Sequence, residues 1–305
     1  MMDPTIDKSL LYHNLNEGVL EERRGAFERN LRRNLPLIGR FGGLAPVVPE
    51  FKGRTAIVIG AGPSLEPNYD VLRKYQHHRE LAYIATDMAL RPLLRQGIRP
   101  GYVFSCETSP VDYFGGLDTS GIRLMAFSCM AHINLRKWKG DVSFYNWMIR
   151  RPEYDTLWER AGMGLGFVAT GGLVTTQAVA FALGCGIAGL VMAGNDLGFS
   201  DRFYARETAA HLRPGAAPAR IVPLETIEMG LSRRAMEYRL VRGGTVFYTT
   251  RQFLAAKMWL EDLFKGRKGV YDCSNPGCSE KYVAKIELAR FLGTIAGGKR
   301  RRKGR

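Results

Sequence analysis

The segment 56–65, Ala-Ile-Val-Ile-Gly-Ala-Gly-Pro-Ser-Leu, constrains the fold of this chain more than any other. Its β-branched start predicts a buried strand, and its glycines allow a tight turn after that strand. Pro63 suits the first turn of a helix, where a missing N–H costs nothing. The N–H groups of Gly60, Gly62 and Ser64, with the Ser64 hydroxyl, would then face an anion. We therefore predict a nucleotide-phosphate site, with a ligand-free strand-to-helix turn as the alternative.

The same glycines argue against a dinucleotide-binding site. That site follows the pattern G-x-G-x-x-G/A, in which the third small residue lets the helix pack closely on the strand. Leu65 occupies the third position, and residues 66–68, Glu-Pro-Asn, interrupt the helix that should follow. Asp87 could pass for the ribose-binding acid of such a site, but it does not explain Leu65. Flavin and nicotinamide enzymes are therefore disfavoured, and no Walker lysine, nucleophile elbow or zinc signature occurs.

Four blocks of sequence, in order along the chain, resemble motifs of two related protein families. They are residues 60–65, 85–90, 97–105 and the pair 183–185 with 194–197. The families are the archaeal 6-hydroxymethylpterin diphosphokinases of the MptE type and the motility accessory factor (Maf) proteins, which glycosylate flagellin. A Gly-Asn-Gly-Pro-Ser-Leu version of the first block lines the CMP site of some bacterial sialyltransferases. The resemblance covers roughly residues 50 to 290.

This resemblance implies a nucleotide-dependent transferase. The donor would be a CMP-activated nonulosonic (sialic-like) acid, which is passed to a hydroxyl of a protein or glycan acceptor. One alternative is a 6-hydroxymethyl-7,8-dihydropterin diphosphokinase that uses ATP and Mg²⁺, and the absence of large flanking regions favours this subgroup. A second alternative is a non-enzymatic protein that binds nucleic acid or another anion through its basic segments.

The composition is typical of an intracellular protein that binds anions. The formal net charge of the 305-residue chain is +15, and such a charge attracts nucleotides and anionic polymers. Part of the excess lies in residues 299–305, which we expect to form a basic tail able to contact an anionic polymer. The odd number of cysteines, five, indicates reduced thiols and a cytoplasmic location.

The chain divides into three expected parts. These are an N-terminal helical extension (1–45), a Rossmann-like catalytic domain (46–294) and a basic disordered tail (295–305). The N-terminus lacks the pattern of a secretion signal. Residues 166–194 carry no charge and could span a bilayer. Their glycines and threonines instead predict a buried helix followed by a strand, so we expect no transmembrane segment.

The central part alternates strands with helices, which predicts an α/β, Rossmann-like fold with a parallel-rich sheet and helices on both faces. The expected strands are 55–59, 81–85, 102–105, 123–127, 142–145, 190–193 and 269–272. The expected helices include 5–40, 174–183, 224–240, 252–264 and 281–292. The first of these has an apolar face with Leu20, Phe27, Leu31 and Leu35, and a face rich in arginine. It is either a docking helix or a basic surface for an anionic partner.

Ligands of such sheets bind outside the carboxyl ends of the strands. The nucleotide-binding candidates are Gly60, Gly62, Pro63, Ser64, Asp87, Thr108, Thr175, Thr176 and Asn195. Asp87 either caps a helix or binds a ribose hydroxyl or a base edge. Thr175 and Thr176 either touch the nucleotide, as the resemblance implies, or simply start a helix. Residues 274–278 stand where the families have a turn near the ligand. Residues 198–223 form either a lid or acceptor-contacting segment, or a disordered loop.

The catalytic candidates are Glu107, Asp196 and Tyr204. Glu107, with Asp87, could hold Mg²⁺ against a diphosphate, or Glu107 could orient a sugar. In the diphosphokinase alternative, Asp196 would join them as a third metal ligand. Asp196 could otherwise act as a base or bind the acceptor, and a structural hydrogen bond is the remaining interpretation. Tyr204 stands near the histidine or tyrosine of the families. It could stabilise a leaving phosphate but would be a poor base at neutral pH.

Overall fold

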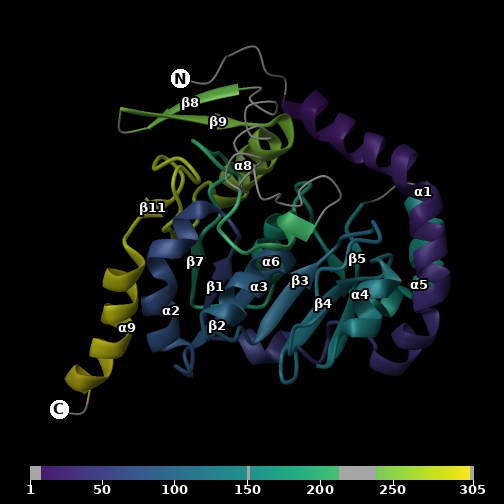
Figure 1. Ribbon diagram of the computed structural model, residues 1–305, viewed down its shortest axis with the longest axis horizontal. Helices are drawn as coiled ribbons and strands as arrows, with labels where there is room; N and C mark the ends of the chain where they lie inside the picture. Colours follow the sequence, from purple (N-terminus) through teal and green to yellow (C-terminus); the bar gives the residue numbers. More distant parts are fainter. Residues whose placement is uncertain (1–7, 150–151, 213–237, 243, 303–305) are drawn as a thin grey trace, which may run out of the picture.

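The computed structural model describes residues 8–149, 152–212, 238–242 and 244–302 (Figure 1). Within these ranges, nine strands form one parallel sheet with the order β11-β10-β7-β1-β2-β3-β4-β5-β6. The strands are β1 (Thr55–Ile59), β2 (Leu81–Thr86), β3 (Tyr102–Ser105), β4 (Arg123–Phe127), β5 (Val142–Trp147), β6 (Phe167–Val168), β7 (Gly189–Ala193), β10 (Val270–Asp272) and β11 (Ala284–Lys285). A separate antiparallel hairpin joins β8 (Tyr238–Arg242) to β9 (Thr245–Thr249).

Helices cover both faces of the sheet, as the alternating pattern predicts. They are α1 (Lys8–Phe41), α2 (Tyr69–Tyr75), α3 (Asp87–Arg95), α4 (His132–Lys137), α5 (Pro152–Ala161), α6 (Val174–Gly184), α8 (Arg251–Phe264) and α9 (Leu288–Arg302). Helix α3 packs on β2 and β3, and α6 packs on β1, β2 and β3 from the opposite face. The predicted α/β, Rossmann-like fold is therefore confirmed.

The order of the strands reverses at β1. From β1 the chain adds β2 to β6 on one side, and β7, β10 and β11 lie on the other. Ile59, the last residue of β1, pairs with Ala85 of β2 and with Ala193 of β7. A parallel sheet binds its ligands at such a switch point, because the connections on either side leave a crevice at the carboxyl ends of the strands.

Helix α1 belongs to the folded body. The ring of Phe27 is fully buried, with its centroid 5.6 Å from those of Phe127 and Trp147. The buried side-chain amide of Asn34 donates hydrogen bonds of 2.9 Å to the carbonyl oxygens of Ser128 and Met130. Leu35, expected on the apolar face, is 36% exposed. The docking interpretation of this helix is confirmed, but a buried asparagine replaces part of the expected apolar face.

The uncharged segment 166–194 contains β6, α6 and β7, so the interpretation as a buried helix followed by a strand is confirmed. In the described ranges, no helix combines the length and apolarity required to cross a membrane. The C-terminal helix differs from expectation: 284–285 form a strand, and α9 begins at Leu288 and continues to Arg302, inside the expected tail. Of the expected helix 224–240, residues 224–237 lie outside the described part, and 238–240 belong to β8. The division into three parts stays a prediction.

Candidate active site

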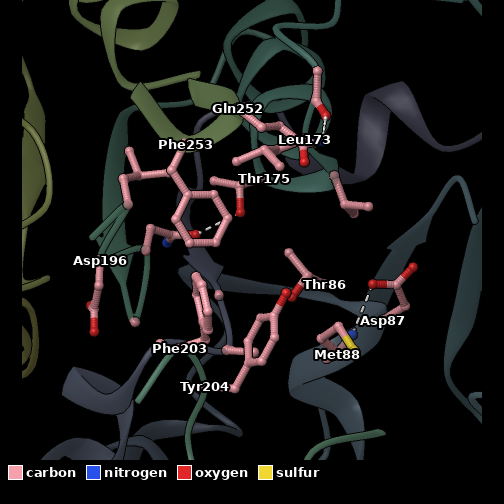
Figure 2. Close-up of a pocket in the computed structure, with 18 of the residues that line it drawn as sticks. Thr86, Asp87, Met88, Leu173, Thr175, Asp196, Phe203, Tyr204, Gln252 and Phe253 are labelled. Carbon is pink, nitrogen blue, oxygen red and sulfur yellow. Dashed lines mark hydrogen bonds between the residues drawn. The ribbon is translucent and has the colours of Figure 1, made fainter. Parts of the chain in front are cut away.

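A pocket of about 340 Å³ opens at the carboxyl ends of β1, β2, β3 and β7 (Figure 2). Residues that directly follow these strands form its floor. The walls include the start of α6, the start of α8, both ends of the segment 197–204, Tyr113, and Arg23 of α1. The pocket therefore occupies the switch point at which the strand order predicts a ligand.

Most of the predicted site residues line this pocket. Those that do are Gly60, Gly62, Asp87, Glu107, Thr175, Asn195, Asp196 and Tyr204. The other four, Pro63, Ser64, Thr108 and Thr176, lie outside its lining. The structure thus brings together candidates that are up to 144 residues apart in the sequence, between Gly60 and Tyr204.

The backbone of the turn after β1 differs from expectation. The Gly60 N–H donates to the Ala193 carbonyl oxygen at 2.9 Å, and the Gly62 N–H donates to that of Gly194 at 2.7 Å. The Ser64 N–H donates to Oδ2 of Asp196 at 3.0 Å. The expectation that these three N–H groups face an external anion is corrected, because the turn after β7 already accepts their hydrogen bonds.

The glycines of the two turns are explained by this close approach. A Cβ atom at Gly60 would lie 2.4 Å from Oδ1 of Asn195. At Gly62, it would lie 2.5 Å from the carboxylate of Asp196. Gly194 has a φ of +68°, and its Cβ would lie 2.6 Å from the Gly60 carbonyl oxygen. Only residues without side chains let these turns interlock, since real Cβ contacts do not approach so closely.

The side chain of Asp196 is held inside the turn after β1. In addition to the Ser64 N–H, the Ser64 hydroxyl and the Asn275 N–H donate to its carboxylate, the latter at 3.4 Å. The residue is 4% exposed. Burial raises the pKa of Asp196 to about 6, because the lost hydration of the charged form outweighs the hydrogen bonds that favour it. A carboxyl with a pKa near the working pH is suited to general base catalysis.

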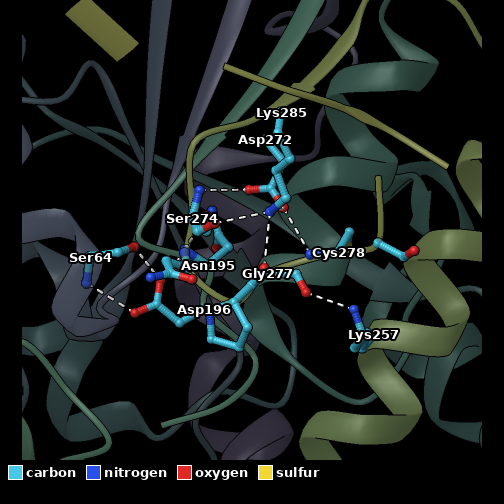
Figure 3. A network of polar contacts seen from close by, with 12 residues as sticks. Ser64, Asn195, Asp196, Lys257, Asp272, Ser274, Gly277, Cys278 and Lys285 are labelled. Atoms are coloured by element: carbon cyan, nitrogen blue, oxygen red, sulfur yellow. Dashed lines mark hydrogen bonds and ion pairs between the residues drawn. The ribbon is translucent and has the colours of Figure 1, made fainter. Parts of the chain in front are cut away.

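The loop 273–278 fixes the backbone of Asn195 and Asp196 from the other side (Figure 3). The Asn195 N–H donates to the Ser274 hydroxyl at 2.8 Å, and the Gly277 N–H donates to the Asp196 carbonyl oxygen at 2.7 Å. This loop occupies the position at which the family resemblance implied a turn near the ligand. It contacts Asp196 and contributes nothing to the lining of the pocket.

Two lysine side chains, the buried Lys257 and the partly buried Lys285, hold this loop in place. Lys285 Nζ lies 2.6 Å from Oδ2 of Asp272 and donates to the carbonyl oxygens of Ser274 and Pro276. Lys257 Nζ donates to the Gly277 carbonyl oxygen at 2.6 Å (Figure 3). Asp272 is fully buried, and its carboxylate pairs with the Lys285 ammonium group and accepts hydrogen bonds of 2.8 Å from the Ser274 and Cys278 N–H groups.

The other polar candidates form hydrogen bonds within the protein, several of them to residues far away in the sequence. Asn195 Nδ2 donates to the Val58 carbonyl oxygen, and its Oδ1 accepts from the Thr175 hydroxyl, both at 2.8 Å. The Thr176 hydroxyl donates to the Leu173 carbonyl oxygen at 2.6 Å, near the start of α6. The Thr108 carbonyl oxygen accepts from the Asn30 side chain at 3.0 Å. These contacts position backbone around the pocket.

Asp87 and Glu107 lie at the ends of β2 and β3. Asp87 is the first residue of α3, and its carboxylate accepts from the Met88 N–H at 2.8 Å and from the Ser105 hydroxyl at 2.6 Å. Glu107 accepts from the Ser109 N–H at 2.9 Å and lies 3.7 Å from Arg23 Nη1. Within the described residues, no three His, Cys, Asp or Glu side chains are grouped to hold a metal. The expected cluster of these two with Asp196 is therefore wrong.

Sequence reasoning identified Tyr204 but missed Phe203 and Phe253, the other rings of the aromatic wall of the pocket. Phe203 and Phe253 meet edge to face, with their ring centroids 5.9 Å apart, and Tyr204 lies beside Phe203 (Figure 2). The basic side chain in the lining, Arg23, was assigned to a surface. The spacing of aromatic residues at 199, 203 and 204 was a signal in the sequence, but the path of the loop decides which rings face the pocket.

Residues 29–202 match the protein family described as 6-hydroxymethylpterin diphosphokinase MptE-like. None of the curated proteins matches the chain. Among solved structures, the fold resembles the MAf glycosyltransferase from Magnetospirillum magneticum AMB-1, with a TM-score of 0.52 and 17% sequence identity. The similar region covers 78% of this chain and 34% of that protein, so this chain spans about a third of its length. At this identity the likeness shows a shared fold.

Proposed function

Since the chain belongs to the 6-hydroxymethylpterin diphosphokinase MptE-like family, we propose that it is a nucleotide-dependent transferase. The observation that carries the proposal is the pocket at the strand switch point, whose lining includes Asp196, the aromatic wall and Arg23. An aromatic wall suits the planar ring of a base, and an arginine suits a phosphate or carboxylate group. The buried Asp196, with its pKa of about 6, supplies an acid–base group beside them.

We propose a CMP-activated nonulosonic acid as the donor. The identity of this donor is inferred from the resemblance of residues 60–65 to the motif of bacterial sialyltransferases. In the transfer step, a bond forms between the acceptor hydroxyl oxygen and the anomeric carbon of the sugar. The bond from that carbon to the phosphate oxygen breaks, and its electron pair leaves with CMP. Asp196 takes the hydroxyl proton, while Tyr204 donates a hydrogen bond to the leaving phosphate and Glu107 orients the sugar.

The second candidate function is a pterin diphosphokinase. The description of the family favours it, and so does the presence of Asp87 and Glu107 in the lining. Mg²⁺ is commonly held by one or two carboxylates together with substrate phosphates, so these two residues suffice without Asp196. A pterin, like a base, offers a planar ring to the aromatic wall.

All five cysteines are free, which fits a reducing compartment, and we propose the cytoplasm as the location. We also propose that Gly60, Gly62, Thr175 and Asn195 form the part of the pocket nearest the nucleotide. Because their polar groups are already paired within the protein, they act by shaping the backbone against which the ligand lies.

Calorimetric titration separates the candidates. The ligands are CMP, CDP, ATP with and without Mg²⁺, and a short DNA duplex. Binding that selects CMP without a metal supports the glycosyltransferase, and a response that requires both ATP and Mg²⁺ supports the diphosphokinase. Tight duplex binding that weakens steeply with salt, without a nucleotide response, would contradict both and favour a nucleic-acid-binding protein.

A further inference from the structure

The aromatic segment, residues 199–206, is anchored at both ends. At its start, Phe199 and Tyr248 exchange two backbone hydrogen bonds of 2.8 and 2.7 Å. At its end, the Ala205 N–H donates to the Ala61 carbonyl oxygen at 2.7 Å, within the turn after β1. The segment therefore crosses from the β8–β9 hairpin to the strand switch point, with Phe203 and Tyr204 between the two anchors.

Glu66 adds a third, charged anchor. Its two carboxylate oxygens accept from Nη1 and Nη2 of Arg202 at 2.8 and 2.9 Å, and the Arg206 N–H donates to Oε1 at 2.7 Å. The Arg202 and Glu66 side chains are only 18% and 23% exposed. Paired, nearly parallel hydrogen bonds between a guanidinium and a carboxylate fix orientation as well as distance, and partial burial limits their screening by salt.

The charge of Glu66 is favoured by this arrangement. Burial raises its pKa, but the hydrogen bonds from Arg202 and Arg206 outweigh burial and hold the pKa below its usual range. Glu66 lies in the 3-10 helix Pro63–Asn68, which directly follows the turn after β1. The interruption of the expected helix by Glu-Pro-Asn thus has a structural role, since it aims Glu66 at the aromatic segment.

The residues between the anchors line the pocket. The Phe203 ring centroid lies 4.1 Å from that of Phe199 and 5.9 Å from that of Phe253. Phe203 and Tyr204 both belong to the pocket lining (Figure 2). A loop of this kind keeps two rings in one place only when the backbone on either side is held.

We propose that Glu66 is a positioning residue that fixes Phe203 and Tyr204 as the wall on which the planar ring of the ligand stacks. The ring-binding part rests on the proposed function, because both candidate ligands carry a heteroaromatic ring. The anchoring part rests on the contacts of Glu66 alone. Glu66 touches neither the pocket nor the reacting atoms, and it acts through Arg202 and Arg206.

Hydrogen exchange tests the anchoring without any ligand. We compare the amides of residues 199–206 in the wild type, in Glu66→Ala and in the control Asp70→Ala. Asp70 pairs with Arg73 on the surface of α2, and its side chain is 94% exposed. We expect faster exchange in the aromatic segment for Glu66→Ala alone, with partial restoration in Glu66→Gln, which keeps one acceptor. Unchanged exchange, or an equal increase throughout β1 and α6, would overturn the proposal.

Titration tests the ring-binding part. We expect Glu66→Ala and Phe203→Ala to weaken CMP and cytidine binding by a similar factor, roughly tenfold. Neither change should alter the affinity for inorganic pyrophosphate, which has no ring, whereas a general loss of structure would weaken all three ligands. Equal affinities for cytidine in the variants and the wild type overturn the ring-binding part. If the wild type binds no ring-containing ligand, both the proposed function and the ring-binding part are wrong. Hydrogen exchange would then still test whether Glu66 anchors the aromatic segment.

Discussion

The carboxylate of Asp196 lies within the turn after β1, where its Oδ2 accepts the Ser64 N–H at 3.0 Å. This contact joins the turns that follow β1 and β7, the two strands beside which the strand order reverses. The Ser64 N–H, which was expected to bind a phosphate, therefore donates to a carboxylate of the protein itself. The pocket is consequently shaped by an internal acid, and its chemistry depends on the protonation of that acid.

The stability of the protein should depend on pH through Asp196. Its folded-state pKa of about 6 exceeds the ordinary aspartate pKa of 3.8, so the folded protein binds this proton more tightly than the unfolded chain does. The carboxyl therefore favours folding below about pH 4, and this contribution is lost as the pH rises through about 6. Asp196→Asn has no titrating group at this position. We expect the free energy of unfolding of the wild type, relative to Asp196→Asn, to fall by about 3 kcal/mol over this range.

Urea unfolding at several pH values measures this difference. Asp70→Asn, which changes an exposed carboxylate, is the matched control. A constant difference between the wild type and Asp196→Asn from pH 4 to 7 would contradict the raised pKa.

Gly62→Ala should destabilise the protein although its backbone suits any residue. Gly62 has a φ of −72° and a ψ of 158°, so the substitution causes no backbone strain. The added Cβ would lie 2.5 Å from the Asp196 carboxylate. We expect a loss of about 1–3 kcal/mol, as for other overpacked sites, together with weaker nucleotide binding. Gly101→Ala, where a Cβ has open space, should leave both quantities nearly unchanged in thermal unfolding and calorimetry.

Arg23→Gln should weaken the binding of anionic ligands. Arg23 reaches the pocket from α1, and its Nη1 lies 3.7 Å from Oε1 of Glu107. A hydrogen bond to a charged group contributes about 1.5–3 kcal/mol, so a loss of about tenfold or more in the affinity for CMP is expected. Arg24→Gln removes an arginine that pairs with Glu28 on the same helix, and it should have little effect. Equal losses in both variants would indicate a nonspecific effect of net charge.

Lys285→Met should unfold the loop 273–278 or the whole domain. The substitution leaves the fully buried Asp272 without its ammonium partner. Breaking a buried ion pair in this way costs about 3–5 kcal/mol. Lys281→Met, which changes an exposed lysine four residues earlier, should cost less than about 0.5 kcal/mol. Chemical denaturation of both variants tests this, and similar midpoints would show that Lys285 is dispensable.

Much of the fold could be predicted because its central strands are short, mostly apolar and largely buried. β1, β3 and β4 have the expected bounds, since each lies between turn residues that end it clearly. Local pattern was a poor guide to β11 and to the start of α9, where pairing with β10 decides the structure. The burial of Asn34 was also missed, because its hydrogen-bond partners lie 94 and 96 residues away.

The candidate site could be predicted as a set of residues but not as a set of contacts. Residues that follow strands must gather at one edge of a parallel sheet, so Asp87, Glu107 and Asp196 could be identified from their position together with the family resemblance. The backbone N–H groups that stay available to a ligand depend on how closely the turns after β1 and β7 approach each other. No pattern within either turn predicts that distance. The amide of Ser64 is the clearest case, since its acceptor lies 132 residues further along the chain.

The docking of Phe27 of α1 against Trp147 and Tyr154 has a consequence for biosynthesis. Helix α1 precedes this binding surface in the chain, and the surface is complete only after more than a hundred further residues have been synthesised. During that interval the nascent chain carries an amphipathic helix whose apolar stripe has no native partner. Helix α1 can therefore reach its native packing only after β5 and α5 have been synthesised, so an early segment of this chain is among the last to pack.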